Sequence, residues 1–185
     1  MDRQTQRALF RAMIAARRID ELERELTSRG EAFFHVSGAG HEGTAALAPH
    51  LTPSDWLHCH YRDKALMLAR GLEPRAFFDS LYCKRISHSH GRQMSAHMCD
   101  PALNVLSIVG PVGNSGLQAV GVAAAVAGRP QKPIVLCSVG DGTSQQGEML
   151  EAIAHAVREQ LPVLFLVEDN RWAISSTTDA KTCYS

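Results

Sequence analysis

Two polar turns, each directly after a short apolar run, constrain the fold of this chain more than any other feature. Gly140-Asp141-Gly142 follows the apolar run 134–139, and Asp169-Asn170 follows the apolar run 162–167. Helical periodicity over about 147–160 separates the two runs. A strand, a helix and a second strand at this spacing predict adjacent parallel strands joined by a right-handed crossover. Both polar turns then lie at the carboxyl edge of the sheet, where open α/β sheets bind ligands.

The residue types at this edge suit a magnesium ion that also holds a diphosphate. Asp141 offers a carboxylate and Asn170 a side-chain carbonyl, and both are hard oxygen ligands. Gly140 and Gly142 let the main chain approach phosphate groups closely, and the N-terminus of the following helix favours negative charge. A lone Gly-Asp-Gly is a common turn. Its pairing with Asn170 across a strand, a helix and a strand is far more specific.

The rest of the chain divides into a mainly helical first half and an α/β second half. Residues 2–29 carry apolar side chains at a spacing near 3.6 and predict one amphipathic helix that Gly30 ends. We expect further helices over 44–51, 64–70 and 74–82, a loop over 87–104, a strand over 105–109 and a small-residue helix over 116–128. Residues 175–185 are typical of a loop, so the predicted sheet is unfinished where the chain ends.

Composition places the chain among ordinary globular proteins. Of its 185 residues, 45% are hydrophobic and 21% charged, and 19 basic residues balance 19 acidic ones. This balance provides no basic surface for nucleic acid, and no apolar run reaches the roughly 20 residues that span a bilayer. We therefore expect no nucleic-acid partner, no membrane partner and a cytoplasmic location.

The cysteines and histidines indicate a metal site only weakly. The five cysteines are spread along the chain without a C-x-x-C pair, so we expect free thiols. His58-Cys59-His60 and His88-Ser89-His90 alternate histidines, but neither is accompanied by a second cluster at ligand spacing. The sequence therefore predicts no dedicated transition-metal site.

The spacing between the two polar turns resembles the motif of thiamine-diphosphate-dependent enzymes. Other segments resemble, in order along the chain, the alpha subunit of the dehydrogenase component of 2-oxo acid dehydrogenase complexes, and most closely its branched-chain type. These segments are Gly40-His41-Glu42-Gly43, Asp55-Trp56, Tyr61-Arg62-Asp63, Gly91-Arg92-Gln93-Met94 with His97, Gly110-Pro111, Gln118-Ala119-Val120-Gly121 and Asn170-Arg171-Trp172-Ala173-Ile174-Ser175. The resemblance spans roughly residues 5 to 178.

The resemblance implies a thiamine-diphosphate-binding α/β fold, a parallel sheet with helices on both faces. An N-terminal helix (1–30) then precedes the cofactor-binding domain (31–185). The implied cofactors are thiamine diphosphate and Mg²⁺.

The resemblance also assigns roles to individual residues. It implies that Asp141, Asn170 and the main-chain carbonyl of Trp172 hold the metal. Tyr61 and Arg62 match a pair that contacts the diphosphate, and a guanidinium fork suits such a contact. The residues implied to line the cofactor are Gly110, Val112, Gly142 and Thr143. No catalytic residue is certain, and His97 is the one candidate.

The implied function is thiamine-diphosphate-dependent oxidative decarboxylation of a 2-oxo acid, with acyl transfer to a lipoyl group. The implied partners are a beta subunit, which supplies a glutamate needed for catalysis, and a lipoyl-bearing acyltransferase. Branched-chain 2-oxo acids are favoured, with pyruvate and acetoin as alternatives. A non-catalytic assembly fragment and a magnesium-dependent hydrolytic domain also remain open.

Three features depart from the family pattern. Glu168 stands where branched-chain relatives carry a cationic residue that faces the phosphates, and Gly113-Asn114-Ser115 replaces a segment that builds a potassium site in some relatives. We therefore predict no potassium site. The chain has about half the family's typical length, which indicates an N-terminal fragment or a degenerate protein.

Overall fold

The structure, a computed structural model, describes residues 1–184, and the chain divides into two compact units. Unit 1 comprises residues 1–53 and 61–107, and unit 2 comprises residues 54–60 and the chain from 108 onward. Within the described residues, no helix has both the length and the apolar character needed to cross a bilayer. Each unit is described by itself below.

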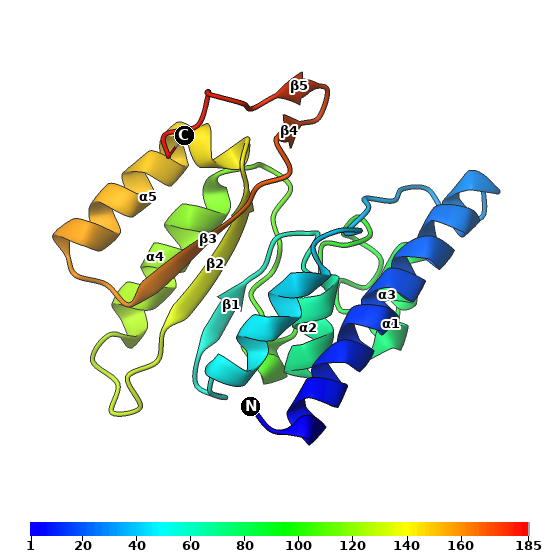
Figure 1. Cartoon of the computed structure of the whole chain (residues 1–185), viewed down its shortest axis with the longest axis horizontal. Coiled ribbons are helices and arrows are strands. Elements are labelled where there is room, and N and C mark those ends of the chain that lie inside the picture. Colours follow the sequence, from blue (N-terminus) through cyan, green and yellow to red (C-terminus); the bar gives the residue numbers. More distant parts are fainter. Residues whose placement is uncertain (185) are drawn as a thin grey trace. The chain divides into compact units, whose positions relative to one another are not determined.

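Unit 2 contains the predicted parallel sheet. The strands β1 (Trp56–His58), β2 (Val135–Gly140) and β3 (Val163–Glu168) lie in the order β1-β2-β3, and both neighbouring pairs are parallel. The helices α4 (Asn114–Val126) and α5 (Gly147–Arg158) lie together beside β2 and β3 (Figure 1). The α/β class, the adjacent parallel strands and the helical connection between them are confirmed.

The core of unit 2 lies between the sheet and these two helices. Odd-numbered residues of β2 pack with α4 and α5 because side chains alternate along a strand. The buried members of this cluster are Ala119, Ala123, Val135, Cys137, Val139 and Met149. Small residues on α4 have a physical reason, since a Cβ at Gly116 would overlap the side chain of Met149 on α5.

Unit 1 is mainly helical. Its elements are α1 (Arg3–Ser28), η1 (Glu42–His50), α2 (Lys64–Arg70), α3 (Pro74–Leu81) and η2 (Pro101–Leu103). The Asp2 side chain caps α1 by accepting a hydrogen bond from the Thr5 N–H at 2.8 Å, and Gly30 follows the helix with φ +75°. The predicted helices at 2–29, 64–70 and 74–82 are therefore confirmed.

The long helix α1 is an integral part of unit 1. Leu9 and Ala16 are buried in one cluster with Ala45 of η1 and Ala65 of α2. Because α1 shares this core, the boundary expected at residue 30 does not coincide with the division into the two units.

One predicted strand is wrong, and three short strands were not predicted. Residues 105–109 form no strand, because Val105 pairs with Asp100 in an isolated antiparallel bridge instead. The sheet position beside β2 is taken by β1, whose three residues carry no clear alternation. The segment 175–185, which was expected to be a loop, contains β5 (Ser176–Thr177), and β5 pairs with β4 (Trp172–Ala173) in a short hairpin.

Candidate functional site

The carboxyl edge of the unit 2 sheet places the two predicted metal ligands on neighbouring strand ends. Gly140, the last residue of β2, is in register with Glu168, the last residue of β3. Asp141 follows the first of these residues directly, and Asn170 follows the second by two positions. The structure thus confirms the adjacency that the spacing predicts. It brings a carboxylate and an amide carbonyl to the same edge.

Asp141 is a buried carboxylate without a cationic partner among the described residues. It is 2% exposed, and its Oδ2 accepts a hydrogen bond from the hydroxyl of Thr178. Its main-chain carbonyl accepts a hydrogen bond from the Ser144 hydroxyl at 2.6 Å. A buried carboxylate is costly unless a cation compensates it. The site is therefore chemically suited to a metal ion.

The hairpin β4–β5 links Asn170 to Asp141. Asn170 Oδ1 accepts a hydrogen bond from the Trp172 N–H at 2.8 Å, which fixes the side-chain amide in a local turn. Trp172 pairs with Thr177, and the Thr178 N–H donates to the Arg171 carbonyl at 3.0 Å. The hairpin thereby places the hydroxyl of Thr178 beside the Asp141 carboxylate. No sequence pattern points to Thr178, since a single threonine in a polar loop is common.

Two glycines allow close packing around this edge. A Cβ at Gly142 would lie 2.6 Å from the Cβ of Ala173, so a larger residue would displace the hairpin. Gly113 has φ +95°, and a Cβ there would lie 2.9 Å from the Cβ of Gln146. The loop that ends at Gly113 therefore lies against the turn that follows Asp141.

The predicted cofactor-lining residues differ in burial. Thr143 is buried and opens the short helix η3 (Thr143–Gln145). Gly110 is exposed and Val112 is 49% exposed, so Val112 is available for contact with a ligand. The helix predicted to begin at about residue 147 is confirmed, because α5 begins at Gly147, and η3 lies between it and the Gly-Asp-Gly turn.

His60 and Glu168 occupy the same edge. His60 Nδ1 lies 3.7 Å from Glu168 Oε1, and both side chains are buried. The His60 N–H donates to Ser138 Oγ of β2 at 2.8 Å, which fixes the chain after β1. Glu168, which departs from the family pattern, therefore has a basic group beside it from within unit 2.

The alternating histidines do not form a metal cluster in the described part of the chain. His58 Nε2 lies 2.9 Å from Gln118 Oε1 of α4, and burial lowers the pKa of this imidazole. His88 Nε2 lies 2.8 Å from the His97 carbonyl oxygen, and His90 Nδ1 lies 2.9 Å from the Arg85 carbonyl oxygen. These imidazoles therefore make local structural contacts.

Tyr61, Arg62 and His97 belong to unit 1. The Arg62 guanidinium carbon lies 5.2 Å from the centre of the Tyr61 ring, and a guanidinium N–H of Arg62 donates to the Ser37 carbonyl. The Tyr61 and His97 rings are stacked with their centres 6.5 Å apart. His97 is 8% exposed, and its Nδ1 lies 3.1 Å from the Ser95 carbonyl oxygen. The structure therefore brings these three predicted residues together.

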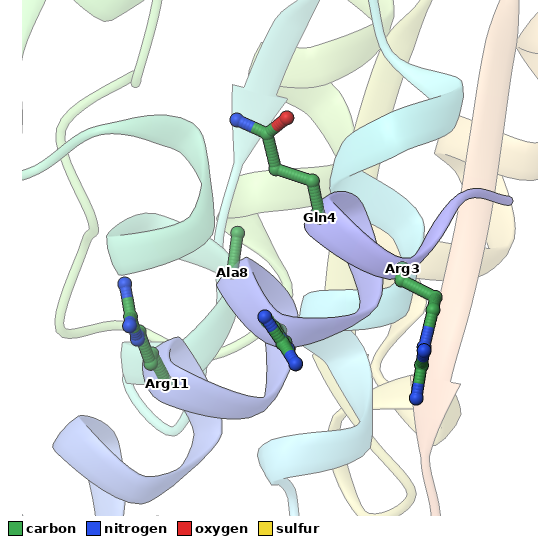
Figure 2. Close-up of a pocket in the computed structure, with 5 residues that line it drawn as sticks. Arg3, Gln4, Ala8 and Arg11 are labelled. Atoms are coloured by element: carbon green, nitrogen blue, oxygen red, sulfur yellow. The ribbon is translucent and has the colours of Figure 1, made fainter.

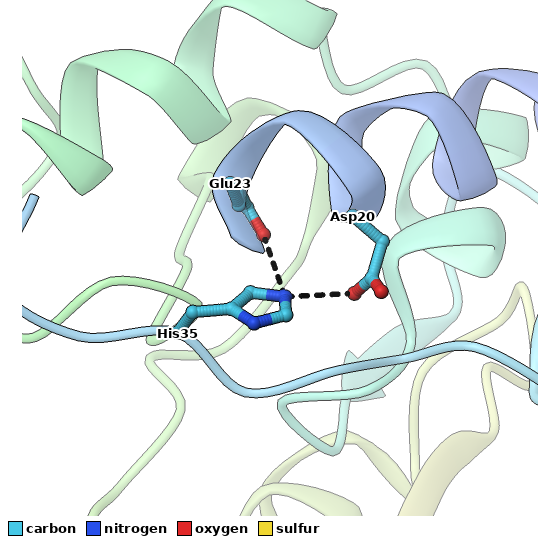
Figure 3. A group of neighbouring side chains, drawn as sticks. All are labelled: Asp20, Glu23 and His35. Carbon is cyan, nitrogen blue, oxygen red and sulfur yellow. Dashed lines mark hydrogen bonds and ion pairs between the residues drawn. The ribbon is translucent and has the colours of Figure 1, made fainter. Parts of the chain in front are cut away.

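A buried ionic cluster in unit 1 was not predicted. Asp20 and Glu23 of α1 face His35, whose Nε2 lies 3.2 Å from Asp20 Oδ1 and 3.9 Å from Glu23 Oε2 (Figure 3). Lys64 Nζ lies 3.1 Å from Asp20 Oδ1 and 3.0 Å from Glu23 Oε2. We call Asp20, Glu23, His35 and Lys64 the buried ionic cluster. No sequence pattern links these residues, because they come from three separate segments.

This cluster predicts a loss of stability in acid. Burial alone would raise the pKa of Asp20, but hydrogen bonds from Gly38 and Ser37 and the charge of Lys64 lower it from 3.8 to about 2. A carboxyl group with a lowered pKa in the folded state stabilises the protein above its unfolded pKa, and this contribution is lost as the pH falls toward about 2. We expect a loss of about 2 kcal/mol from this source.

The measurement is the free energy of unfolding between about pH 5 and pH 2, for the wild type and the Asp20→Asn variant. Burial raises the pKa of Glu23, and the Asp20 charge raises it further, so Asp20→Asn removes part of this effect of opposite sign. The difference between the two curves therefore reports Asp20 together with its influence on Glu23. Parallel curves over this range would contradict the prediction.

Two surface hollows in unit 1 are lined by residues with no predicted role in metal binding. The first, of about 530 Å³, lies along the first turns of α1 (Figure 2). It is lined by Arg3, Gln4, Arg7, Ala8 and Arg11. The second, of about 300 Å³, includes Arg92, Gln93 and Met94 from the segment that resembles the family.

Comparison with known proteins identifies a matching family model and several named relatives. The family model described as "Dehydrogenase E1 component" matches residues 10–184. The chain is 32% identical over 176 residues to the 2-oxoisovalerate dehydrogenase subunit alpha of Bacillus subtilis, covering 92% of this chain and 53% of that protein. It is 27% identical over 171 residues to the mitochondrial 2-oxoisovalerate dehydrogenase subunit alpha 2 of Arabidopsis thaliana, covering 92% of this chain and 36% of that protein.

A relative with a different named activity also matches. The chain is 27% identical over 184 residues to the alpha subunit of acetoin:2,6-dichlorophenolindophenol oxidoreductase from Cupriavidus necator, covering 98% of this chain and 55% of that protein. The chain thus spans about half the length, or less, of these relatives. Because the family model matches nearly the whole sequence, the chain belongs to the dehydrogenase E1 component family.

Proposed function

We propose that this chain binds thiamine diphosphate and Mg²⁺ as the alpha subunit of a 2-oxo acid dehydrogenase. The observation that carries the proposal is the position of Asp141 and Asn170 at neighbouring ends of parallel strands that are in register. Membership of the dehydrogenase E1 component family and the named relatives support it.

Asp141, Asn170 and the Trp172 main-chain carbonyl would hold the magnesium ion. All three supply hard oxygen atoms, which Mg²⁺ prefers. The buried Asp141 carboxylate lacks a cation among the described residues, so a divalent ion would compensate its charge. Thr178 keeps one carboxylate oxygen oriented and leaves Oδ1 without a hydrogen bond from any described residue. The donor set therefore fits the metal.

In unit 1, Tyr61 and Arg62 would contact the diphosphate. The Ser37 carbonyl accepts from one guanidinium N–H, and the Tyr61 ring packs beside the guanidinium. A guanidinium has five N–H donors, so others remain for phosphate oxygens. In unit 2, Gly142, Thr143, Gly110 and Val112 would line the cofactor. His97 remains a candidate whose stacking on Tyr61 favours a positioning role.

When bound, thiamine diphosphate supplies the nucleophilic carbon that attacks the keto carbon of a 2-oxo acid. The residues of this chain bind and orient the cofactor rather than carry out that attack. We propose branched-chain 2-oxo acids as substrates, because two of the matched relatives are named 2-oxoisovalerate dehydrogenases. The acetoin-linked relative makes acetoin the alternative substrate.

The proposed partners are a beta subunit and a lipoyl-bearing acyltransferase that accepts the acyl group. Subunit names of the relatives support the first. A cytoplasmic location also stays a proposal, since the matched Arabidopsis thaliana protein is mitochondrial. A non-catalytic fragment and a hydrolytic domain gain no support from the family.

Calorimetric titration tests the proposed function. We expect thiamine diphosphate to bind the full-length subunit, assembled with its partner subunit, only when Mg²⁺ is present, because Asp141 would hold the metal and the metal would offset the negative charge of the diphosphate. The control is the same titration with EDTA in place of the metal. Equal affinity with and without Mg²⁺ would contradict the proposed metal site.

A further inference from the structure

We propose that Lys64 is a positioning residue that acts through Asp20 and residues 35–38 to hold Arg62 ready for the diphosphate. This inference rests on the proposed function, which assigns Arg62 to the diphosphate. The chain of contacts from Lys64 to Arg62 lies entirely within unit 1.

The first step is the environment of Lys64. Its side chain is only 2% exposed, and its ammonium group lies between the carboxylates of Asp20 and Glu23. Lys64 is also the first residue of α2, where the helix dipole disfavours a positive charge. Burying such charges costs more free energy than burying apolar groups of the same shape. Stability alone therefore does not explain the buried ionic cluster. A role in fixing a conformation explains it better.

The second step is what the buried ionic cluster holds. Asp20 Oδ1 accepts from the Gly38 N–H at 2.7 Å, and Asp20 Oδ2 accepts from the Ser37 hydroxyl at 2.7 Å. Lys64 Nζ donates to the Val36 carbonyl at 3.2 Å. Each of residues 35–38 thus contacts Asp20 or Lys64, His35 through its imidazole. The cluster therefore fixes this segment, which lies outside any helix or strand, against α1 and α2.

The third step joins the segment to Arg62. The Ser37 carbonyl accepts from the Arg62 guanidinium. Gly38 also lies against the Arg62 main chain, because a Cβ at residue 38 would be 2.8 Å from the Arg62 carbonyl oxygen. Residue 37 thus contacts the guanidinium of Arg62, and residue 38 contacts its main chain. A shift of the segment would move the guanidinium and its remaining donors.

The buried ionic cluster is not proposed as a metal site. Asp20, Glu23 and His35 have ligand atoms within 4.8 Å of one another, which is compatible with an ion. The Lys64 ammonium already lies within hydrogen-bond distance of both carboxylates, so it serves as the cation there.

The test is a double-mutant cycle between Lys64→Met and Arg62→Gln, with the affinity for magnesium thiamine diphosphate measured by calorimetry. The protein is the full-length subunit assembled with its partner. We expect Arg62→Gln to weaken binding roughly 10- to 100-fold, because it removes a charge-assisted contact. Lys64→Met should weaken it about tenfold in the wild-type background, and less than about twofold in the Arg62→Gln background.

The non-additive result distinguishes positioning from general destabilisation, because a merely structural effect would weaken binding equally in both backgrounds. Lys64→Arg should restore most of the affinity, since it keeps the cation. Arg18→Met is the matched control: it removes a cation of α1 whose side chain is 75% exposed and paired with Glu21, and it should leave the affinity unchanged.

Lys64→Met leaves two buried carboxylates without their lysine and can prevent folding. Ser37→Ala then takes the place of Lys64→Met in the same cycle. It removes the hydroxyl contact with Asp20 and a longer hydrogen bond from the Ala39 N–H, and it leaves Asp20, Glu23 and Lys64 in place. We expect a loss of about threefold that disappears in the Arg62→Gln background. Additive effects, or none, would overturn the inference. An unchanged affinity in Arg62→Gln alone would instead contradict the role that the proposed function gives Arg62.

Discussion

Replacing Asp141 by alanine should abolish the magnesium-dependent binding of thiamine diphosphate. The carboxylate is the one charged ligand in the proposed set, and the other two ligands are neutral carbonyl oxygens. Without it, the metal loses its only anionic protein ligand, and the diphosphate loses its link to the sheet edge. Mutations in the shell around a metal typically cost 10- to 100-fold in affinity. Loss of a ligand should therefore cost more than about 100-fold.

The measurement is calorimetric titration of the full-length assembled enzyme with thiamine diphosphate at saturating Mg²⁺. Asp179→Ala is the matched control, because Asp179 is an exposed carboxylate next to Thr178 and its side chain has no proposed role. Thermal unfolding of both variants separates a lost ligand from a lost fold. The metal assignment would be refuted by a folded Asp141→Ala variant that binds the cofactor as tightly as the wild type.

The second half of the chain was largely predictable from the sequence. The apolar runs of β2 and β3 and the helical period between them are local sequence signals. Two strands joined by a helix are expected to pair in parallel through a right-handed crossover, and β2 and β3 do pair in parallel. The positions of Asp141 and Asn170 follow from those elements alone. Their burial and hydrogen bonds do not, because the hairpin that returns Thr178 depends on contacts distant in sequence.

Elements without a strong local pattern were not predictable. β1 has only three residues. One of them is the buried His58, whose hydrogen-bond partner is Gln118 on α4, 60 positions further along the chain. Residues 105–109 are apolar enough for a strand, yet Val105 bonds to Asp100 instead. The buried ionic cluster was also not predictable, because no local sequence pattern links its residues. Lys64 resembles an ordinary surface lysine at a helix start until α1 is packed beside it.

The polypeptide of residues 1–185 alone should show no 2-oxo acid decarboxylation, even at saturating cofactor and Mg²⁺. We propose that turnover needs a carboxyl group in contact with a ring nitrogen of the cofactor's aminopyrimidine, at the end of the cofactor away from the diphosphate. General acid–base catalysis requires such a contact with the nitrogen that carries the proton. The glutamates of this chain are placed for other tasks. Glu23 contacts Lys64, Glu42 contacts Arg17, and Glu168 lies at the carboxyl edge of the sheet beside His60.

Glu148, Glu151 and Glu159 are no better placed. Glu148 is in the first turn of α5, close after Asp141 and hence at the end of the proposed site that would hold the diphosphate, and Glu151 and Glu159 are exposed farther along α5 or just after it. We therefore expect the required carboxyl group to come from the proposed beta subunit. The expected effect is a complete loss of turnover in the isolated polypeptide, although Mg²⁺-dependent cofactor binding need not be lost.

The assay follows decarboxylation of a branched-chain 2-oxo acid with an artificial electron acceptor. It compares the polypeptide alone, the full-length subunit alone, and the full-length subunit with its beta partner. Only the last should turn over, and an Asp141→Ala version of that complex is the negative control. Turnover by the polypeptide alone would show that one of its own carboxyl groups reaches the aminopyrimidine. Glu42→Gln and Glu168→Gln would then identify which group it is, because removing the proton-holding carboxyl would abolish that activity.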